Sequence, residues 1–309
     1  MSILDLISQN AAYFYGLVAI FSLLVGSFLN VVIHRLPIMM ERAWREGLEE
    51  FNALNEPPTL SNAETGPSGG EISQVDNTEA PDVFNLAVPR SRCPSCNHEI
   101  TALQNIPIIS YLMLGGKCGN CKAPISARYP IVEFVTMVLS LVVAWQFGPT
   151  PQALLGIVAT WFLISMTMID FDHQLLPDTL TLPLMWIGLL AALMPVFADL
   201  QSSVIGAAAG YMVLWSVYQL FKLVTGKEGM GYGDFKLLAA LGAILGWQAL
   251  PMIILLSSLV GAILGIAIIS MTGRDKNIPM PFGPFLATAG WIAMLWGETM
   301  TNWYYGLLS

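Results

Sequence analysis

The stretch Gly231-Tyr232-Gly233-Asp234 separates two long apolar runs, and an earlier aspartate, Asp170, ends a third. Gly231 and Gly233 lack a Cβ atom, so another backbone segment can approach closely there. Carboxylates at the edge of a membrane segment are costly and usually functional. Two that share a site would hold one proton between them. The pair Asp170 and Asp234 therefore predicts proton-transfer chemistry of the kind that an aspartic peptidase uses.

The composition indicates a polytopic membrane protein. Of 309 residues, 55% are hydrophobic and 11% are charged, whereas about 25% are charged in soluble proteins. The net charge is −8 at pH 7, but ten of the 21 acidic residues lie between Glu41 and Asp82. The negative charge thus belongs mainly to one polar loop. We expect a membrane lipid environment and no nucleic-acid partner.

Apolar runs predict an all-α fold with about eight transmembrane helices. The first run, Ala11–Ile33, has 23 uncharged residues, enough to cross a bilayer. Later runs cover 130–147, 152–170, 180–198, 201–222 and 284–303. Leu237–Gly273 is uncharged over 37 residues, too long for one span, and Gly246–Pro251 predicts a turn inside it. The segment 235–246 is short, so a full crossing and a re-entrant segment both remain open.

The basic residues predict the orientation. With the N-terminus outside and eight crossings, all 13 Lys and Arg lie in or beside the predicted cytoplasmic segments 34–129, 171–179, 223–236 and 273–283. Asp170 and Asp234 would then share the cytoplasmic face. We expect a first transmembrane helix in 1–33, a cytoplasmic loop in 34–128 and a multi-helix membrane domain in 129–309. Within the loop, Pro57–Asp82 predicts a flexible acidic linker.

Other acids compete with the chosen pair. Asp178 precedes Thr179 and the next apolar run, which favours a helix N-cap. Asp172 lies further into the loop and is the main rival of Asp170, which directly follows the apolar run. All three can also be ordinary interfacial acids. For Asp234, the alternative is a cap on the helix that follows the glycines.

The four cysteines occur as two pairs with metal-ligand spacing. Cys93 and Cys96 are followed, after 21 residues, by Cys118 and Cys121. This C-x2-C…C-x2-C pattern suits a structural Zn²⁺ ion held by four thiolates. Disulfides are disfavoured in a reducing cytoplasm, while a redox thiol pair remains the alternative. The sequence therefore predicts a small cytoplasmic zinc-binding module.

Several motifs together resemble the bacterial type IV prepilin peptidases, the leader peptidase/N-methyltransferases. The resemblance covers nearly the whole chain. The matching stretches are Gly26–Pro37, both cysteine pairs, Asn105–Tyr111, Arg128–Glu133, Asp170–Asp178 and Gly231–Lys236.

The resemblance implies a GxGD-type aspartic peptidase of the bacterial inner membrane, multi-pass, with its active site facing the cytoplasm. Such enzymes remove the leader of prepilins and pseudopilins after a Gly, then methylate the new N-terminus with S-adenosylmethionine. The family's aspartate pair maps onto Asp170 and Asp234, and its zinc cysteines onto the four cysteines here. The residues that bind S-adenosylmethionine, and the oligomeric state, are not indicated. The alternatives from other classes are an ion-coupled transporter and a thiol-redox membrane protein.

Overall fold

The computed structural model describes residues 10–55, 84–101, 103–227, 229–272 and 281–308. In these ranges the regular structure is helical, with two isolated β-bridges and no strand. The all-α membrane fold predicted from hydropathy is therefore confirmed. The whole predicted acidic linker 57–82, and most of the segment 273–283, lie outside the described residues.

The long helices follow the predicted apolar runs. They are α2 (Ala11–Asn55), α4 (Arg128–Phe147), α5 (Pro151–His173), α6 (Asp178–Ala191), α7 (Leu200–Thr225), α8 (Tyr232–Leu245), α9 (Leu250–Thr272) and α10 (Gly283–Leu308). The short elements η1 (Leu103–Asn105) and α3 (Ile109–Met113) lie between α2 and α4. The turn η2 (Trp247–Ala249) divides the 37-residue apolar run, as predicted.

Helix length limits what can be said of the crossings. In the part of the chain that the structure describes, five segments are long and apolar enough to span a membrane: α2, α4, α5, α7 and Trp247–Ala267. Helices α6 and α8 have 14 residues each, or about 21 Å at 1.5 Å per residue. This is less than the roughly 30 Å hydrocarbon core. The total of eight crossings therefore stays a prediction.

Helix α2 differs from its prediction. The sequence suggests a break after Ile33, but the structure shows one helix of 45 residues with Pro37 inside it. At 1.5 Å per residue it is about 68 Å long, so part of it must extend beyond the bilayer. Its buried residues, including Val18, Leu29 and Leu36, recur at helical spacing. This face packs against α4, which is why the helix is not interrupted at the membrane edge.

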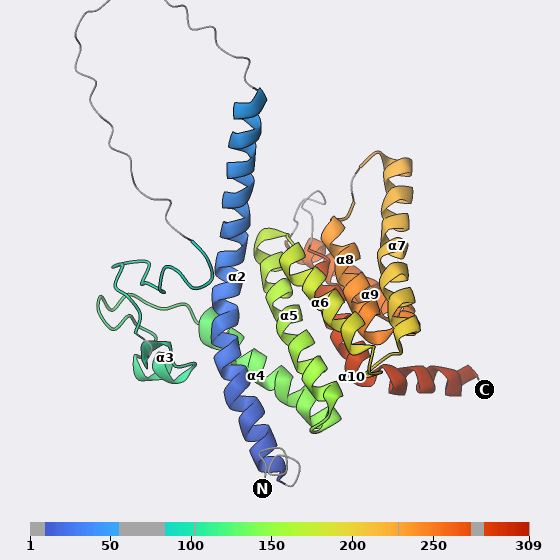
Figure 1. The fold of residues 1–309 in the computed structure, drawn as a ribbon, viewed down its shortest axis with the longest axis horizontal. Helices are drawn as coiled ribbons and strands as arrows, with labels where there is room; N and C mark the ends of the chain where they lie inside the picture. Colours follow the sequence, from blue (N-terminus) through green and yellow to red (C-terminus); the bar gives the residue numbers. More distant parts are fainter. Residues whose placement is uncertain (1–9, 56–83, 102, 228, 273–280, 309) are drawn as a thin grey trace, which may run out of the picture.

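Helix α8 is the centre of the bundle. It packs against α6, α7, α9 and α10, and its residues from Asp234 to Ile244 are buried except Lys236. Its neighbour α7 approaches most closely at Gly206, where a Cβ atom would lie 2.2 Å from the Gly242 carbonyl oxygen. Figure 1 shows α2 and α4 crossing on one side of the bundle and α7 on the other. Small residues thus let a short apolar helix be enclosed on all sides.

Candidate active site

Asp170 lies in the last turn of α5, at the end of the bundle where α6, α8 and α10 begin. Its side chain is buried, and its Oδ2 accepts a hydrogen bond from the backbone N–H of Gly283 at 3.0 Å. Gly283 is the first residue of α10. A Cβ atom there would lie 2.6 Å from the same Oδ2. The N-terminus of α10 therefore positions the Asp170 carboxylate, and only glycine fits beside it.

Asp234 lies in the first turn of α8 and is also buried. Gly231 occupies the N-cap, and the Asp234 carboxylate accepts a hydrogen bond from the Gly231 backbone N–H, so the alternative of a capping role for Asp234 is compatible with this position. Among the described residues, its Oδ1 atom is buried without a hydrogen-bond partner. Buried polar atoms are nearly always bonded. An unpaired carboxylate oxygen at this depth is an acceptor available to a bound molecule.

Leu176, in the turn between α5 and α6, connects the surroundings of the two carboxylates. A Cβ atom on Gly233 would lie 2.6 Å from Leu176 Cβ, and one on Gly283 would lie 3.1 Å from Leu176 Cδ1. The residue before Asp234 and the residue bonded to Asp170 thus contact the same side chain. The negative charges of Asp170 and Asp234 also interact. The structure brings the two predicted aspartates together across 64 positions of sequence.

The neighbouring acids are engaged elsewhere. Asp172 forms a two-pronged ion pair with Arg128 at the start of α4, with Arg128 Nη1 donating to Asp172 Oδ1 at 3.0 Å. Asp178 is paired with Lys236, whose Nζ lies 2.6 Å from Oδ1 and 2.7 Å from Oδ2. Pro177 holds the N-cap position of α6, so the predicted capping role of Asp178 is wrong by one residue. Both ion pairs are partly exposed.

The four cysteine sulfurs form one cluster. All lie within 4.8 Å of one another, with 3.8 Å between Cys93 Sγ and Cys121 Sγ and 4.0 Å between Cys96 Sγ and Cys118 Sγ. Four sulfurs placed tetrahedrally about 2.3 Å from one ion would be about 3.8 Å apart. A disulfide requires about 2.05 Å. The cluster therefore fits a metal ion with four thiolate ligands and contains no disulfide.

The backbone around each cysteine pair has the same form. Cys93 N–H donates to the His98 carbonyl and Cys118 N–H donates to the Ala123 carbonyl, in each case five residues on. Asn97 and Lys122, each four residues after the first cysteine, have positive φ values of 56° and 61°. The two knuckles are thus local copies of one another.

The thiols of the cluster differ in acidity. The backbone N–H groups of Cys121 and Asn120 lower the pKa of Cys118 to about 6. The Ala123 N–H also lowers the pKa of Cys121, but hydrogen bonding with Cys96 and burial outweigh it and raise that pKa to about 11. The protons are therefore shared unequally within the cluster, and at least one thiolate is available near neutral pH to bind a cation.

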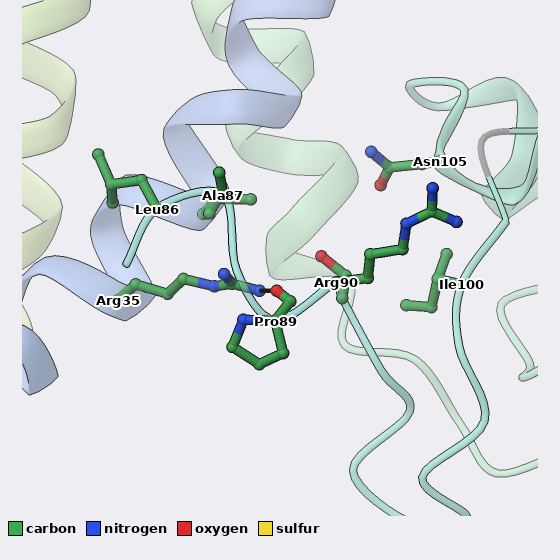
Figure 2. A pocket seen from close by; sticks show the side chains of 9 residues that line it. Arg35, Leu86, Ala87, Pro89, Arg90, Ile100 and Asn105 are labelled. Carbon is green, nitrogen blue, oxygen red and sulfur yellow. Dashed lines mark hydrogen bonds between the residues drawn. The ribbon is translucent and has the colours of Figure 1, made fainter. Parts of the chain in front are cut away.

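A cavity of about 600 Å³ lies between α2, α4 and the cysteine module. This is within the range of small-molecule sites. A second hollow of about 340 Å³ shares most of its lining. Figure 2 shows Arg35 there bonded to the Pro89 carbonyl, and Arg90 extending toward Asn105.

Glu133 lines the larger cavity, and sequence reasoning missed it as a site residue. The apolar run predicted to start at residue 130 would place Glu133 in the first turn of a helix. However, α4 begins at Arg128, so Glu133 lies in the second turn. It is buried, and its Oε2 accepts the backbone N–H of Ile108 at 2.8 Å. Ile108 precedes Glu133 by 25 residues, so a local sequence pattern does not predict this hydrogen bond.

Comparison with known proteins gives matches over most of the chain. Residues 20–147 match the family described as the bacterial peptidase A24 N-terminal domain, and residues 157–266 match the type IV leader peptidase family. A protein from Aeromonas hydrophila named prepilin leader peptidase/N-methyltransferase is 55% identical over 296 residues, covering 94% of this chain and 93% of its own length.

Relatives from other bacteria carry the same name. The Pseudomonas aeruginosa protein is 51% identical over 304 residues, with 98% of each chain covered. The Legionella pneumophila protein is 45% identical over 294 residues, with 95% of each chain covered. No solved structure matches the chain.

Proposed function

Because this chain belongs to the type IV leader peptidase family, we propose that it removes the leader peptide of prepilins and pseudopilins and then N-methylates the new N-terminus. Cleavage after a glycine and methyl transfer from S-adenosylmethionine complete the proposed reaction. The buried pair Asp170 and Asp234 carries the proposal, because two carboxylates with interacting charges are the equipment of an aspartic peptidase. Neither the transporter nor the thiol-redox alternative is supported by these relatives.

In the peptidase step, one carboxylate of the pair is ionised and the other is protonated. The ionised member takes a proton from a water molecule as the water oxygen attacks the scissile carbonyl carbon. The protonated member donates a hydrogen bond to the carbonyl oxygen, where negative charge develops. The unpaired Oδ1 of Asp234 is free to contact the water or the substrate, whereas Asp170 Oδ2 is held by Gly283.

The basic residues support the proposed orientation. Arg128 and Lys236 lie at the same end of the bundle as the aspartate pair, through their ion pairs with Asp172 and Asp178. Positive residues favour the cytoplasmic side. We therefore place the aspartate pair at the cytoplasmic face of the inner membrane, and retain 34–128 as the cytoplasmic segment before the membrane domain 129–309.

The cysteine cluster is proposed to hold zinc. Tetrahedral coordination by four thiolates is the usual structural zinc site, and the observed sulfur separations suit it. The bridges Arg92–Glu99 and Lys117–Pro124 flank the two knuckles. An ion bound to all four sulfurs would join the knuckles into one unit, which also forms a wall of the cavity.

We propose that the same cavity binds the methyl donor. Its lining combines aromatic and polar side chains with cationic groups, including Tyr111, Asn105 and Arg90. Arg90 would bind the carboxylate of the donor, and Tyr111 would contact the adenine ring. When bound, S-adenosylmethionine supplies a methyl group on a positively charged sulfur.

The proposed function is tested by mass spectrometry. The full chain, purified in detergent, is incubated with a prepilin and S-adenosylmethionine. We expect a product that has lost the leader and gained one methyl group, about 14 Da. An unchanged prepilin mass with an otherwise folded, metal-loaded protein would refute the proposal. A separate omission of the donor should leave cleavage intact and remove only the methyl gain.

A further inference from the structure

We infer that Glu133 binds the α-amino group of the cleaved substrate in the cavity between α2, α4 and the cysteine module, and takes its proton during methyl transfer. The inference rests on the proposed function, which requires a methyl acceptor site but does not say where it lies. It assigns to Glu133 a role that is separate from the aspartate pair.

Glu133 is the only carboxylate among the described residues that line the cavity. The cationic or titratable nitrogen side chains there are His34, Arg35, Arg90, Arg92 and His98. The other titratable groups are Tyr111, Tyr129 and the cysteines Cys93 and Cys118 of the metal cluster. The arginines repel an ammonium group that enters this cavity, whereas the Glu133 carboxylate attracts it. The ammonium group should therefore bind beside Glu133.

The carboxylate is fixed from two directions. Glu133 is 7% exposed. The Ile108 N–H donates to its Oε2 from the loop side, and the Ser27 hydroxyl donates to the carboxylate from α2. Next to Ser27, a Cβ atom on Gly26 would lie 2.8 Å from Glu133 Cα, so the two helices meet at this point. Among the described residues no cation pairs with Glu133, and a buried acid with two donors and no such partner is oriented to receive a cation.

The loop that holds Glu133 is strained. Ile108 has φ 57° and ψ −47°, a combination that β-branched residues rarely adopt. The N–H of Ile109 bonds to the Pro107 carbonyl at 2.5 Å, closing a tight turn of the uncommon positive-φ type. The strained residue is the same one whose N–H contacts Glu133. Strain of this kind is kept where surrounding structure enforces it, which is typical of functional sites.

The two carboxylate sites are neighbours across one helix contact. Ile169 and Val132 belong to the same hydrophobic cluster, and they immediately precede Asp170 and Glu133 in sequence. Helices in contact lie about 8–10 Å apart, and α4 packs against α5. A new N-terminus released beside Asp170 and the acceptor site at Glu133 therefore lie on helices that pack against each other.

The chemistry requires a proton acceptor. An α-amino group has a pKa near 8, so at pH 7 most of it is protonated and has no lone pair to react. The Glu133 carboxylate takes one proton from the ammonium group. The nitrogen lone pair then forms the N–CH₃ bond while the S–CH₃ bond of the donor breaks and sulfur keeps the electron pair. The products are a neutral thioether, a methylated ammonium group and protonated Glu133, which returns its proton to solvent.

The test uses a synthetic peptide with a free N-terminal Phe, which needs no cleavage. Glu133→Gln keeps an oxygen for the Ile108 N–H but loses the charge. We expect methylation of this peptide at pH 7 to fall about 100-fold or more, while leader cleavage of intact prepilin stays near that of the unaltered chain. Glu133→Asp should recover part of the methylation. Glu99→Gln, which removes an exposed carboxylate of the module outside the cavity, is the matched control.

The pH profile separates a chemical role from a structural one. With Glu133→Gln, methylation should rise toward that of the unaltered chain as the pH approaches 9–10, because the peptide amine loses its proton to solvent. A rate that stays equally low at all pH values, or one that equals the unaltered chain at pH 7, would overturn the inference. If Glu133→Gln loses cleavage as well, methylation of the short peptide is compared between Glu133→Asp and Glu133→Gln. Higher methylation with Glu133→Asp supports the inference, and equal methylation overturns it.

Binding provides a readout that does not depend on activity. In fluorescence polarisation without donor, the unaltered chain should bind the free-amine peptide about tenfold more tightly than its N-acetylated copy, and Glu133→Gln should lose this preference. Equal preference in both proteins would contradict the role of Glu133. Failure of the unaltered chain to cleave prepilin would instead contradict the proposed function.

Discussion

The aspartate pair and the Glu133 cavity are two carboxylate sites built on opposite principles. Asp170 and Asp234 lie where four helices begin or end, enclosed by glycine contacts and Leu176, with one oxygen of Asp234 unbonded. Glu133 lies in the second turn of α4 and is held by donors from a loop and from α2. The first arrangement places two like charges together, which favours sharing of one proton. The second isolates one charge among cations, which favours binding of one ammonium group.

Substitution of the aspartates should give the largest difference between leader cleavage and methylation. Asp170→Asn and Asp234→Asn keep the shape of the side chain but remove the acid, so each should reduce leader cleavage about 10⁴-fold. Methylation of a pre-cleaved peptide should be nearly unchanged in both. The measurement is mass spectrometry of both substrates with purified protein. Retained cleavage in either variant would remove that residue from the pair.

Loss of the metal should reduce methylation in the Glu133 cavity more strongly than leader cleavage at the aspartate pair. Cys118→Ser removes one of four thiolates, and chelation removes the ion, so the cavity wall formed by the module should loosen. We expect the zinc content to fall from about one ion per chain toward zero, and methylation to fall about 100-fold, with a smaller loss of cleavage. Atomic emission and the two-substrate assay test this. If methylation survives without metal, the module is not needed to shape the cavity.

A smaller, selective effect is expected at Gly283. A Cβ atom in Gly283→Ala would lie 2.6 Å from Asp170 Oδ2, so the carboxylate must shift. Displacement of about 1 Å can cost about 100-fold in rate, and we expect a loss of cleavage of about 10- to 100-fold with methylation preserved. Gly47→Ala is the control, because nothing lies within 4 Å of its Cβ position. Equal activity of the two variants would mean that α10 does not position Asp170.

The smallest effect is expected at the ion pair between Lys236 and Asp178. The pair is partly exposed, and such pairs contribute at most about 1 kcal/mol to stability. Lys236→Met should therefore lower the midpoint of thermal unfolding in detergent only slightly and leave both activities within about threefold. A loss of cleavage comparable to that of Asp234→Asn would show that Lys236 acts on the aspartate pair and not only on the helix termini.

Local patterns accounted for a large part of the fold. Apolar runs marked the helices, and the break at Gly246–Pro251 appeared as the turn η2. The spacing of the cysteines predicted a cluster that the structure contains. Two of the errors of local reasoning concern helix starts: α6 begins at Asp178 and α4 begins at Arg128. The start of a helix depends on which side chain or carbonyl reaches its first free N–H groups, and hydropathy does not report this.

The unbroken course of α2 was also beyond local reasoning. The uncharged run ends at Ile33, which predicted the end of the first helix there, but burial of one face against α4 continues through Leu36. Packing outweighs the loss of one backbone hydrogen bond at proline.

The sequence by itself determined that this is an all-helical membrane chain with a four-thiol cluster and two acids at membrane edges, because hydropathy and ligand spacing are local properties. Only the tertiary structure decided that Asp170 meets Asp234 beside Leu176, that Gly283 holds one of them, and that Glu133 faces a cavity beneath a strained loop. These contacts join segments separated by tens of residues. They arise from the packing of the helices against one another, and the sequence pattern of one helix does not specify that packing.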